Sequence, residues 1–406
     1  MNILSINKFY YRKGGSETVF FGEKELLERN GHRVIPFSMH DPRNEESDYA
    51  RYFVRGVDYE TTRVWDKLSA AGKIVFSFEA RRNISKLLGD HKVDIAHFHI
   101  FQHQISPSVF EPLRKRGIPI VLTLHDLKPV CPTYLMYTRG EVCEKCMGGK
   151  FYHCMLRKCT MGSTAKSLVN VVEMYFHYAM RYYQNVDRYV AVSRFYRDKM
   201  IEAGFPGEQI EYIPNFIDSE LFQYSEVNRG YALYFGRLSE EKGLITLLEA
   251  AEQCPEVPIV IAGAGPDEDK LKQHAAEKKL ANVEFVGFQT GDKLRALLAE
   301  CSFTVLPSVW YENCPMSVLE SLAVGKPVAA ARSGGIPELV EDGVDGFCFK
   351  PRDAGQLAQI MTELFNNNEL REKMGPSARA KIERRFSPKI HTERLQSVYD
   401  DLLNRT

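Results

Sequence analysis

The chain alternates short apolar runs with longer amphipathic stretches, which is typical of parallel sheets whose strands are joined by helices. In the front half the apolar runs predict five strands, at residues 3–6, 34–37, 95–98, 120–124 and 189–192. In the second half they predict six more, at residues 231–235, 259–262, 283–286, 303–306, 327–330 and 346–349. The pattern therefore predicts an α/β fold class with two Rossmann-like domains.

The segment from Ile213 to Gly230 interrupts this pattern with Pro, Asn, Asp and Gly, and we interpret it as the connection between the domains. The domains are then expected at residues 1–217 and 218–386, which suits a chain of 406 residues. Residues 387–406 return to a helical pattern, with Ser387 as N-cap and Pro388 in the first turn. We expect this C-terminal helix to pack back across the domain junction.

Charge is distributed unevenly, although the net charge is zero. Residues 1–217 contain 31 Lys and Arg against 24 Asp and Glu, whereas residues 218–406 contain 22 against 29. The basic front half could face an anionic membrane or an acidic acceptor, and the alternative is an unevenly charged solvated surface. The zero net charge and the absence of a recognisable nucleic-acid-binding module argue against nucleic-acid binding.

The N-terminus has no apolar stretch long enough for a signal peptide, and no window of the sequence resembles a membrane span. We therefore expect a cytoplasmic protein, either in solution or peripheral at the inner face of the cell membrane. In that compartment the nine Cys are not expected to form a disulfide framework.

Candidate functional residues follow the predicted strands, where ligands bind in open α/β sheets. After the first strand, Gly14 and Gly15 precede Ser16, a suitable N-cap, and this turn either binds an anion or merely starts a helix. After residues 120–124 comes His125, followed by Asp126. This pair could contact a sugar hydroxyl, with Asp126 fixing the His125 tautomer, or could be structural.

Two cations, Arg237 and Lys242, enter the next helix after the strand at 231–235. An Arg fork and a compact Lys charge can clamp a diphosphate, and the alternative is surface pairing with Glu240 and Glu241. Their position at a strand end favours phosphate binding.

The most informative stretch, PSVWYENCPMSVLESLAVGKP, follows the strand at 303–306. Pro315 suits the first turn of a helix running to about Val324, whose N–H groups would then point at a ligand. Glu312 precedes this helix and Glu320 lies within it, so two carboxylates can flank one nucleotide sugar. A Glu320 without a function would be costly in its apolar setting.

Asp267 and Asp269 fit the first turn of a helix better than a metal site, so no catalytic metal is expected.

With these residues in chain order, the sequence resembles family 4 retaining glycosyltransferases of bacterial polysaccharide and cell-envelope type. The most specific stretches are ENCPMSVLESLAVGKPV and SGGIPELVEDGVDGF, and the resemblance covers nearly the whole chain. It implies the GT-B fold, in which two Rossmann-like domains face each other across a cleft. Residues 1–217 would bind the acceptor and residues 218–386 the nucleotide sugar.

The resemblance also implies a metal-independent hexosyltransferase that needs no cofactor. It would move a sugar from a UDP- or GDP-sugar to a glycan or lipid-linked acceptor in cell-envelope polysaccharide synthesis. Gly14, Gly15, Arg237 and Lys242 would approach the phosphates, Glu320 the ribose, and Glu312 and His125 the sugar. The implied donor site also includes Asn313, Cys314, Pro315, Met316 and Ser317. Arg237, Lys242, Glu312 and His125 are the catalytic candidates, with no dedicated nucleophile.

Five of the nine Cys lie between Cys131 and Cys159, within a Cys-rich loop at residues 126–165. Cys143 and Cys146 have the spacing of a zinc knuckle, and Cys154 and Cys159 would complete four thiolates. Irregular spacing and the extra Cys131 leave the alternative of ordinary free thiols open.

The aromatic stretch at residues 167–189 has a helical period, with Arg181 and Arg188 nearby. It predicts a core-facing helix, and the alternative is a membrane-docking face.

Two other readings of the whole chain remain. A nucleotide-sugar epimerase shares the implied fold, but no stretch matches its additional acids. A non-catalytic sugar-binding relative would have no chemical use for Lys242, Glu312 and Glu320 together.

Overall fold

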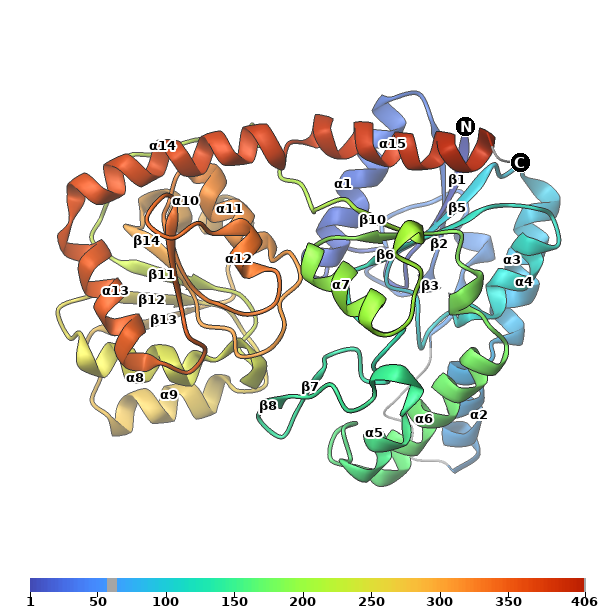
Figure 1. The fold of residues 1–406 in the computed structure, drawn as a ribbon, viewed down its shortest axis with the longest axis horizontal. Helices are drawn as coiled ribbons and strands as arrows, with labels where there is room; N and C mark the ends of the chain where they lie inside the picture. Colours follow the sequence, from blue (N-terminus) through green and yellow to red (C-terminus); the bar gives the residue numbers. More distant parts are fainter. Residues whose placement is uncertain (57–63, 405–406) are drawn as a thin grey trace. The chain divides into compact units, whose positions relative to one another are not determined.

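The computed structural model describes residues 1–56 and 64–404, and the chain divides into two units. Unit 1 contains residues 1–138, 143–213 and those from Thr392 onward, whereas unit 2 contains residues 139–142 and 214–391. Each unit has a six-stranded parallel sheet flanked by helices (Figure 1). The α/β fold class with two Rossmann-like domains is therefore confirmed.

The unit 1 sheet has the order β10-β9-β6-β5-β1-β2. Its strands are β1 (Asn2–Ile6), β2 (Arg33–Phe37), β5 (Ile95–Phe98), β6 (Ile120–Leu124), β9 (Arg188–Ala191) and β10 (Ile210–Tyr212). Two short pairs lie outside it, β3 (Met39–His40) with β4 (Val54–Arg55) and β7 (Tyr137–Thr138) with β8 (Glu141–Val142). The helices assigned wholly to unit 1 are α1 (Gly15–Arg29), α2 (Val64–Val75), α3 (Phe78–Asp90), α4 (Phe110–Arg114), α5 (Tyr152–Leu156), α6 (Thr164–Ala179) and α7 (Arg194–Glu202).

The sequence pattern missed β10, because an edge strand of three residues with a single buried side chain, Ile210, leaves no apolar run. The Cys-rich loop is also more structured than expected, since it contains β7, β8 and α5.

The unit 2 sheet has the order β13-β12-β11-β14-β15-β16. Its strands are β11 (Ala232–Phe235), β12 (Ile259–Ala262), β13 (Val283–Gly287), β14 (Phe303–Leu306), β15 (Val328–Ala331) and β16 (Gly346–Phe349). The helices are α8 (Leu244–Gln253), α9 (Glu268–Glu277), α10 (Gly291–Glu300), α11 (Met316–Val324), α12 (Ile336–Leu339), α13 (Ala354–Asn366) and α14 (Asn368–Arg385). All six predicted strands of this half are present.

Burial on both faces explains why strands such as β11 are continuously apolar. Ala232 and Tyr234 belong to the core under α8, α9 and α13, whereas Leu233 and Phe235 pack on the other face with Leu298 of α10. Alternate side chains of one strand thus fill two cores.

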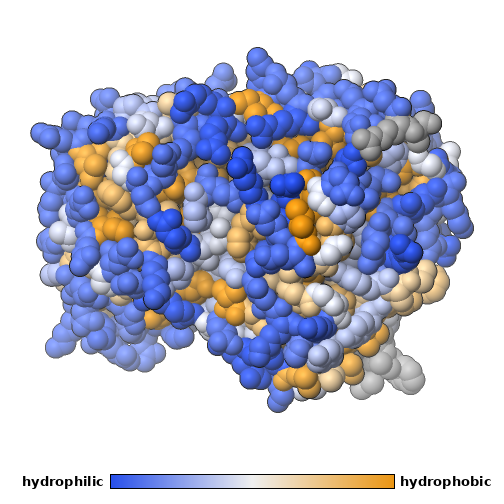
Figure 2. Space-filling view, viewed as in Figure 1, coloured by the Kyte–Doolittle hydropathy of each residue, from blue (hydrophilic) through white to orange (hydrophobic). Residues whose placement is uncertain are grey.

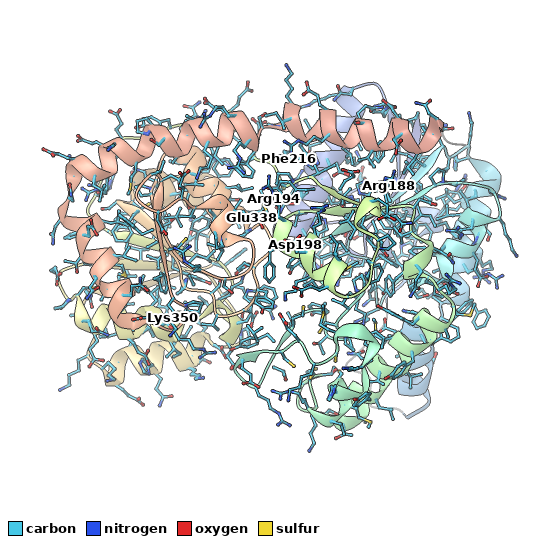
Figure 3. The ribbon with its side chains drawn as sticks, in the orientation of Figure 1. Arg188, Arg194, Asp198, Phe216, Glu338 and Lys350 are labelled. Atoms are coloured by element: carbon cyan, nitrogen blue, oxygen red, sulfur yellow. The ribbon has the colours of Figure 1, made fainter. Side chains whose placement is uncertain are left out.

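The last helix, α15 (Pro388–Asn404), begins as predicted, with Pro388 in the first position and Ser387 Oγ accepting from the Ile390 backbone N–H at 3.5 Å. Farther along, Leu395, Val398, Tyr399 and Leu402 join the unit 1 core with Ile3 and Ile95. Arg188 lies at the start of β9 (Figure 3). It is buried and donates to Asp401 of α15 at 2.7 Å. Arg188 is therefore an internal ion-pair residue and not a membrane-facing cation.

No helix in the described part of the chain combines the length and the apolar content needed to cross a bilayer.

Candidate functional site

The predicted donor-site residues of unit 2 gather where the strand order reverses. The sheet runs outward from β11 in one direction and from its neighbour β14 in the other. Ligands of doubly wound sheets bind beyond the carboxyl ends of the strands at such a reversal. The loop after β11 carries Arg237 and Lys242, and the loop after β14 carries Glu312.

Backbone contacts shape the loop after β11. The Tyr234 hydroxyl donates to the Arg237 carbonyl at 2.7 Å, and Arg237 is exposed. Gly243 ends the loop with φ +70°, and a Cβ there would lie 2.0 Å from the Pro307 carbonyl oxygen. Because only glycine permits this approach, Lys242 is brought against the loop that follows β14.

Lys242 and Glu312 form an ion pair. Lys242 Nζ donates to Glu312 Oε1 at 2.6 Å, and the Ser308 hydroxyl donates to the same oxygen at 2.5 Å. Burial raises the pKa of Glu312, but the Lys242 charge and these hydrogen bonds outweigh it, so the pKa is lowered overall. Lys242 Nζ also lies 5.1 Å from the Trp310 ring centroid. Lys242 is thus positioned by Glu312 and Trp310, not by Glu240 or Glu241.

The SGG motif, Ser333 to Gly335, fixes the backbone conformation at Glu312. Gly334 has φ +59°, and a Cβ there would lie 2.1 Å from the Glu312 carbonyl oxygen. The Gly335 N–H donates to that oxygen at 2.8 Å, and Ser333 Oγ donates to the Trp310 carbonyl at 2.5 Å. The conformation of the Glu312 loop therefore depends on residues more than 20 positions away in sequence.

The start of α11 offers two backbone donors. Pro315 is the N-cap residue, one position earlier than a first-turn proline, and Met316 begins the helix. The Cys314 N–H is already bonded to Asn313 Oδ1 at 2.5 Å, and Asn215 Nδ2 donates to the Cys314 carbonyl at 2.8 Å. Within the described chain, the N–H groups of Met316 and Ser317 have no intramolecular acceptor. These two are the ones placed to bind an anion.

Glu320 lies one turn into α11 and is half-buried. No side chain of the described residues pairs with it, and burial raises its pKa to about 8. Because neither a cation nor a hydrogen-bond donor in the described part of the chain offsets the burial of this carboxylate, hydroxyl donors from a ligand would stabilise its charged form.

In unit 1, Gly14 and Gly15 are exposed at the start of α1. The helix begins at Gly15 with Gly14 as N-cap, so Ser16 is not the cap. Its hydroxyl lies in the first turn and donates to Glu17 Oε2 at 3.2 Å.

His125 joins a buried network that the sequence did not reveal. Its ring stacks on that of His99, with Nε2 3.0 Å from His99 Nδ1. Glu23 Oε1 lies 3.3 Å from His99 Nε2 and 2.9 Å from His97 Nδ1. Asp126 accepts instead from the Lys128 backbone N–H at 3.0 Å. His99 is thus the ring partner of His125, and its sequence signal was its position directly after the predicted strand at 95–98.

A second buried network ties α6 to the loop that follows β6. Lys128 Nζ donates to Glu173 Oε2 at 2.6 Å and to the Pro132 carbonyl at 2.8 Å, and it lies 2.9 Å from His103 Nε2. Burial raises the pKa of Glu173, but Lys128 and His103 lower it to about 2. Because Glu173 is fully buried and charged, it fixes the rotation of α6.

All nine Cys are free thiols. Cys143, Cys146, Cys154 and Cys159 lie in unit 1, and burial, together with the neighbouring thiols, raises the pKa of Cys146 to about 12. Among the described residues, Glu23, His97 and His99 form the one group of His, Cys, Asp or Glu ligand atoms within 4.8 Å of one another. The four thiols are not such a group in this structure, so the zinc site stays a prediction.

Sequence comparison identifies the family of the chain. Residues 13–221 match the Glycosyltransferase Family 4 profile, and residues 218–381 match the glycosyl transferases group 1 profile. The chain belongs to glycosyltransferase family 4. The family 4 resemblance is thereby confirmed, and this family 4 chain is a glycosyltransferase.

Two relatives illustrate the range of similarity. An uncharacterized glycosyltransferase of Methanocaldococcus jannaschii is 28% identical over 59% of this chain and 67% of its own. An amylovoran biosynthesis glycosyltransferase, AmsK of Erwinia amylovora, is 31% identical over 52% of this chain, which spans just over half, 55%, of that relative.

Among solved structures, HepE of Anabaena, in complex with UDP and glucose, aligns with a TM-score of 0.70. The alignment covers 99% of this chain and 100% of HepE at 19% identity, which establishes the shared fold.

Proposed function

We propose that this family 4 enzyme transfers a hexose, with retention, from a nucleotide-diphosphate sugar to a glycan or lipid-linked acceptor in cell-envelope polysaccharide synthesis. The observation that carries the proposal is the arrangement at the β11–β14 reversal. A positioned cation, Lys242, follows β11, and α11, which follows the neighbouring strand β14, carries two free N–H groups and an uncompensated carboxylate. The name of AmsK supports a polysaccharide product, and the UDP bound to HepE supports a uridine donor.

Each group has a distinct part in this proposal. Arg237, Lys242 and the N–H groups of Met316 and Ser317 stabilise charge on the departing diphosphate. Glu320 accepts hydrogen bonds from the ribose hydroxyls. Glu312 holds Lys242 in place and contacts the sugar. His125 and Gly14–Gly15, carried by unit 1, remain predicted contributors to the sugar and phosphate contacts.

The test is transfer by Lys242→Ala, which we expect to lower kcat by ~10² to 10³, the scale for one preorganised donor. Because the change leaves Glu312 buried and unpaired, it also destabilises the fold. The double variant Lys242→Ala/Glu312→Gln should therefore recover stability without recovering transfer. Lys272→Ala, which removes an exposed ion pair with Glu268 on α9, is the matched control. Unchanged turnover of folded Lys242→Ala would refute the assignment.

Donor identity and metal independence need separate measurements. Donor hydrolysis with UDP-, GDP- and ADP-sugars should select one base, with UDP or GDP expected. Transfer should persist in excess EDTA, because Lys242 and Arg237 supply the positive charge. Loss of transfer in EDTA that added Mg²⁺ restores would contradict metal independence.

A further inference from the structure

Unit 1 carries an exposed apolar surface that has no part in the proposed donor site. The α5–α6 face consists of six side chains that are between 43% and 81% exposed: Tyr152, Leu156, Met161, Leu168, Val172 and Tyr175. Leu168, Val172 and Tyr175 are spaced four and three residues apart, so they lie on one side of α6. Figure 2 shows hydrophobic surface over α5 at the lower edge of the molecule, among hydrophilic groups.

Specific contacts join the two helices into one surface. The Tyr175 hydroxyl accepts from the Tyr152 backbone N–H at 3.4 Å, and the Tyr175 ring lies 5.4 Å from that of Phe151. Lys166 Nζ lies 3.4 Å from Met161 Sδ. The opposite side of α6 carries Val171, Met174 and Glu173, which are buried, so the helix cannot turn the exposed stripe inward.

The segment that carries this face is basic. Between residues 145 and 181 the cations are Lys145, Lys150, Arg157, Lys158, Lys166 and Arg181. The single acidic residue in that range, Glu173, is buried against Lys128 and contributes nothing to the surface. An apolar face that includes two tyrosines and lies on a lysine-rich segment matches the interface of an anionic bilayer, where apolar side chains enter and cations meet headgroups.

We propose that the α5–α6 face docks unit 1 onto an anionic lipid surface. The docking is interfacial. It does not depend on the donor site, although it would serve the lipid-linked acceptor of the proposed function by holding the enzyme where such an acceptor resides.

The experiment is co-sedimentation of the full chain with vesicles, without donor or acceptor. Wild type should bind vesicles that are one-third phosphatidylglycerol at low ionic strength and should not bind pure phosphatidylcholine. The variant Lys150→Gln/Lys158→Gln/Lys166→Gln should lose at least about 10-fold in partitioning, because three cations no longer meet the anionic headgroups. Leu156→Asn/Leu168→Asn/Val172→Asn should lose a similar factor.

Matched controls come from unit 2, where Leu221, Val227 and Phe288 are also exposed. Leu221→Asn/Val227→Asn/Phe288→Asn and Lys270→Gln/Lys272→Gln/Lys278→Gln should bind vesicles like wild type. Equal losses in face and control variants, or no wild-type binding at low salt, would overturn the proposal. The proposal would also be overturned if sedimentation velocity showed a dimer that the face variants abolish, and if the wild-type chain did not bind vesicles.

Donor hydrolysis separates this proposal from the previous one. Folded face variants should hydrolyse soluble donor within about two-fold of wild type, well below the ~10² effect of losing a catalytic donor. A wild-type chain that binds vesicles but transfers no sugar would contradict the proposed transferase activity and leave the docking proposal standing.

Discussion

Glu320 shows how one residue links stability to ligand binding. The folded chain holds its proton more tightly than the unfolded chain, because burial raises the pKa from 4.5 to about 8. Its contribution to stability is therefore fully present below pH 4.5 and is lost as the pH rises towards 8. A ribose diol that donates to the carboxylate would reverse this shift.

We predict that Glu320→Gln is more stable than wild type by ~2 kcal/mol at pH 9 and nearly equal to it at pH 5. Urea unfolding at both values measures the difference, and comparing the variant with wild type cancels other titrating groups. A difference independent of pH would show that the carboxyl is already compensated.

Nucleotide binding provides a second readout of the same group. At pH 7, UDP binding should release a proton from Glu320, since hydrogen bonds to the charged carboxylate lower its pKa. Calorimetry in two buffers of different ionisation enthalpy detects this release. Glu320→Gln should abolish it, whereas release that survives the substitution assigns the proton to another group.

Among elements, the SGG turn before α12 shows how a distant segment shapes a site. Gly334→Ala places a methyl group within 2.1 Å of the Glu312 carbonyl at φ +59°. We expect it to cost about 1–3 kcal/mol of stability and to lower kcat/KM at least 10-fold, because the Glu312 loop must move.

Gly343→Ala is the control for that experiment. Gly343 has φ +75° but no neighbour within 4 Å, so the substitution reports the cost of the backbone conformation alone. Similar kinetic losses in both variants would show that contact with Glu312 is not the cause.

The Cys-rich element gives the zinc prediction. We expect about one zinc per chain by elemental analysis, held by Cys143, Cys146, Cys154 and Cys159 in the four-thiolate geometry. Cys146→Ser should release it, whereas Cys254→Ser, in the unit 2 core, should not. Metal content well below one per chain in the wild type excludes a constitutive site.

At the scale of the whole molecule, the carboxy-terminal helix completes the unit 1 core. The Tyr399 hydroxyl lies 2.6 Å from His97 Nδ1, and its ring packs among Ile3, Ile95 and Val121. We expect Tyr399→Ala to destabilise unit 1 by about 3–5 kcal/mol.

Hydrogen exchange measures that effect by element. Protection should fall in β1 and β5, whereas β11 in unit 2 should remain unchanged. Tyr399→Phe should cost far less, since it keeps the ring. Unchanged protection in β1 would show that unit 1 does not require α15.

The sequence by itself determined the architecture and the family. Apolar runs predicted eleven of the twelve strands in the two sheets, because strands buried on both faces leave continuous apolar segments. The ENCPMSVLESLAVGKPV and SGG stretches carried the family, since their glycines and loop residues are required by close backbone approaches. The short edge strand β10 left no such signal.

Only the tertiary structure decided which side chains meet. The Lys242–Glu312 pair, the His125–His99 contact and the Lys128–Glu173 pair each join residues at least 26 positions apart. It also decided that α6 exposes Leu168 and Val172, which a periodic pattern cannot distinguish from a core face. Periodicity reports that a helix has an apolar side, whereas only packing determines whether another element covers it.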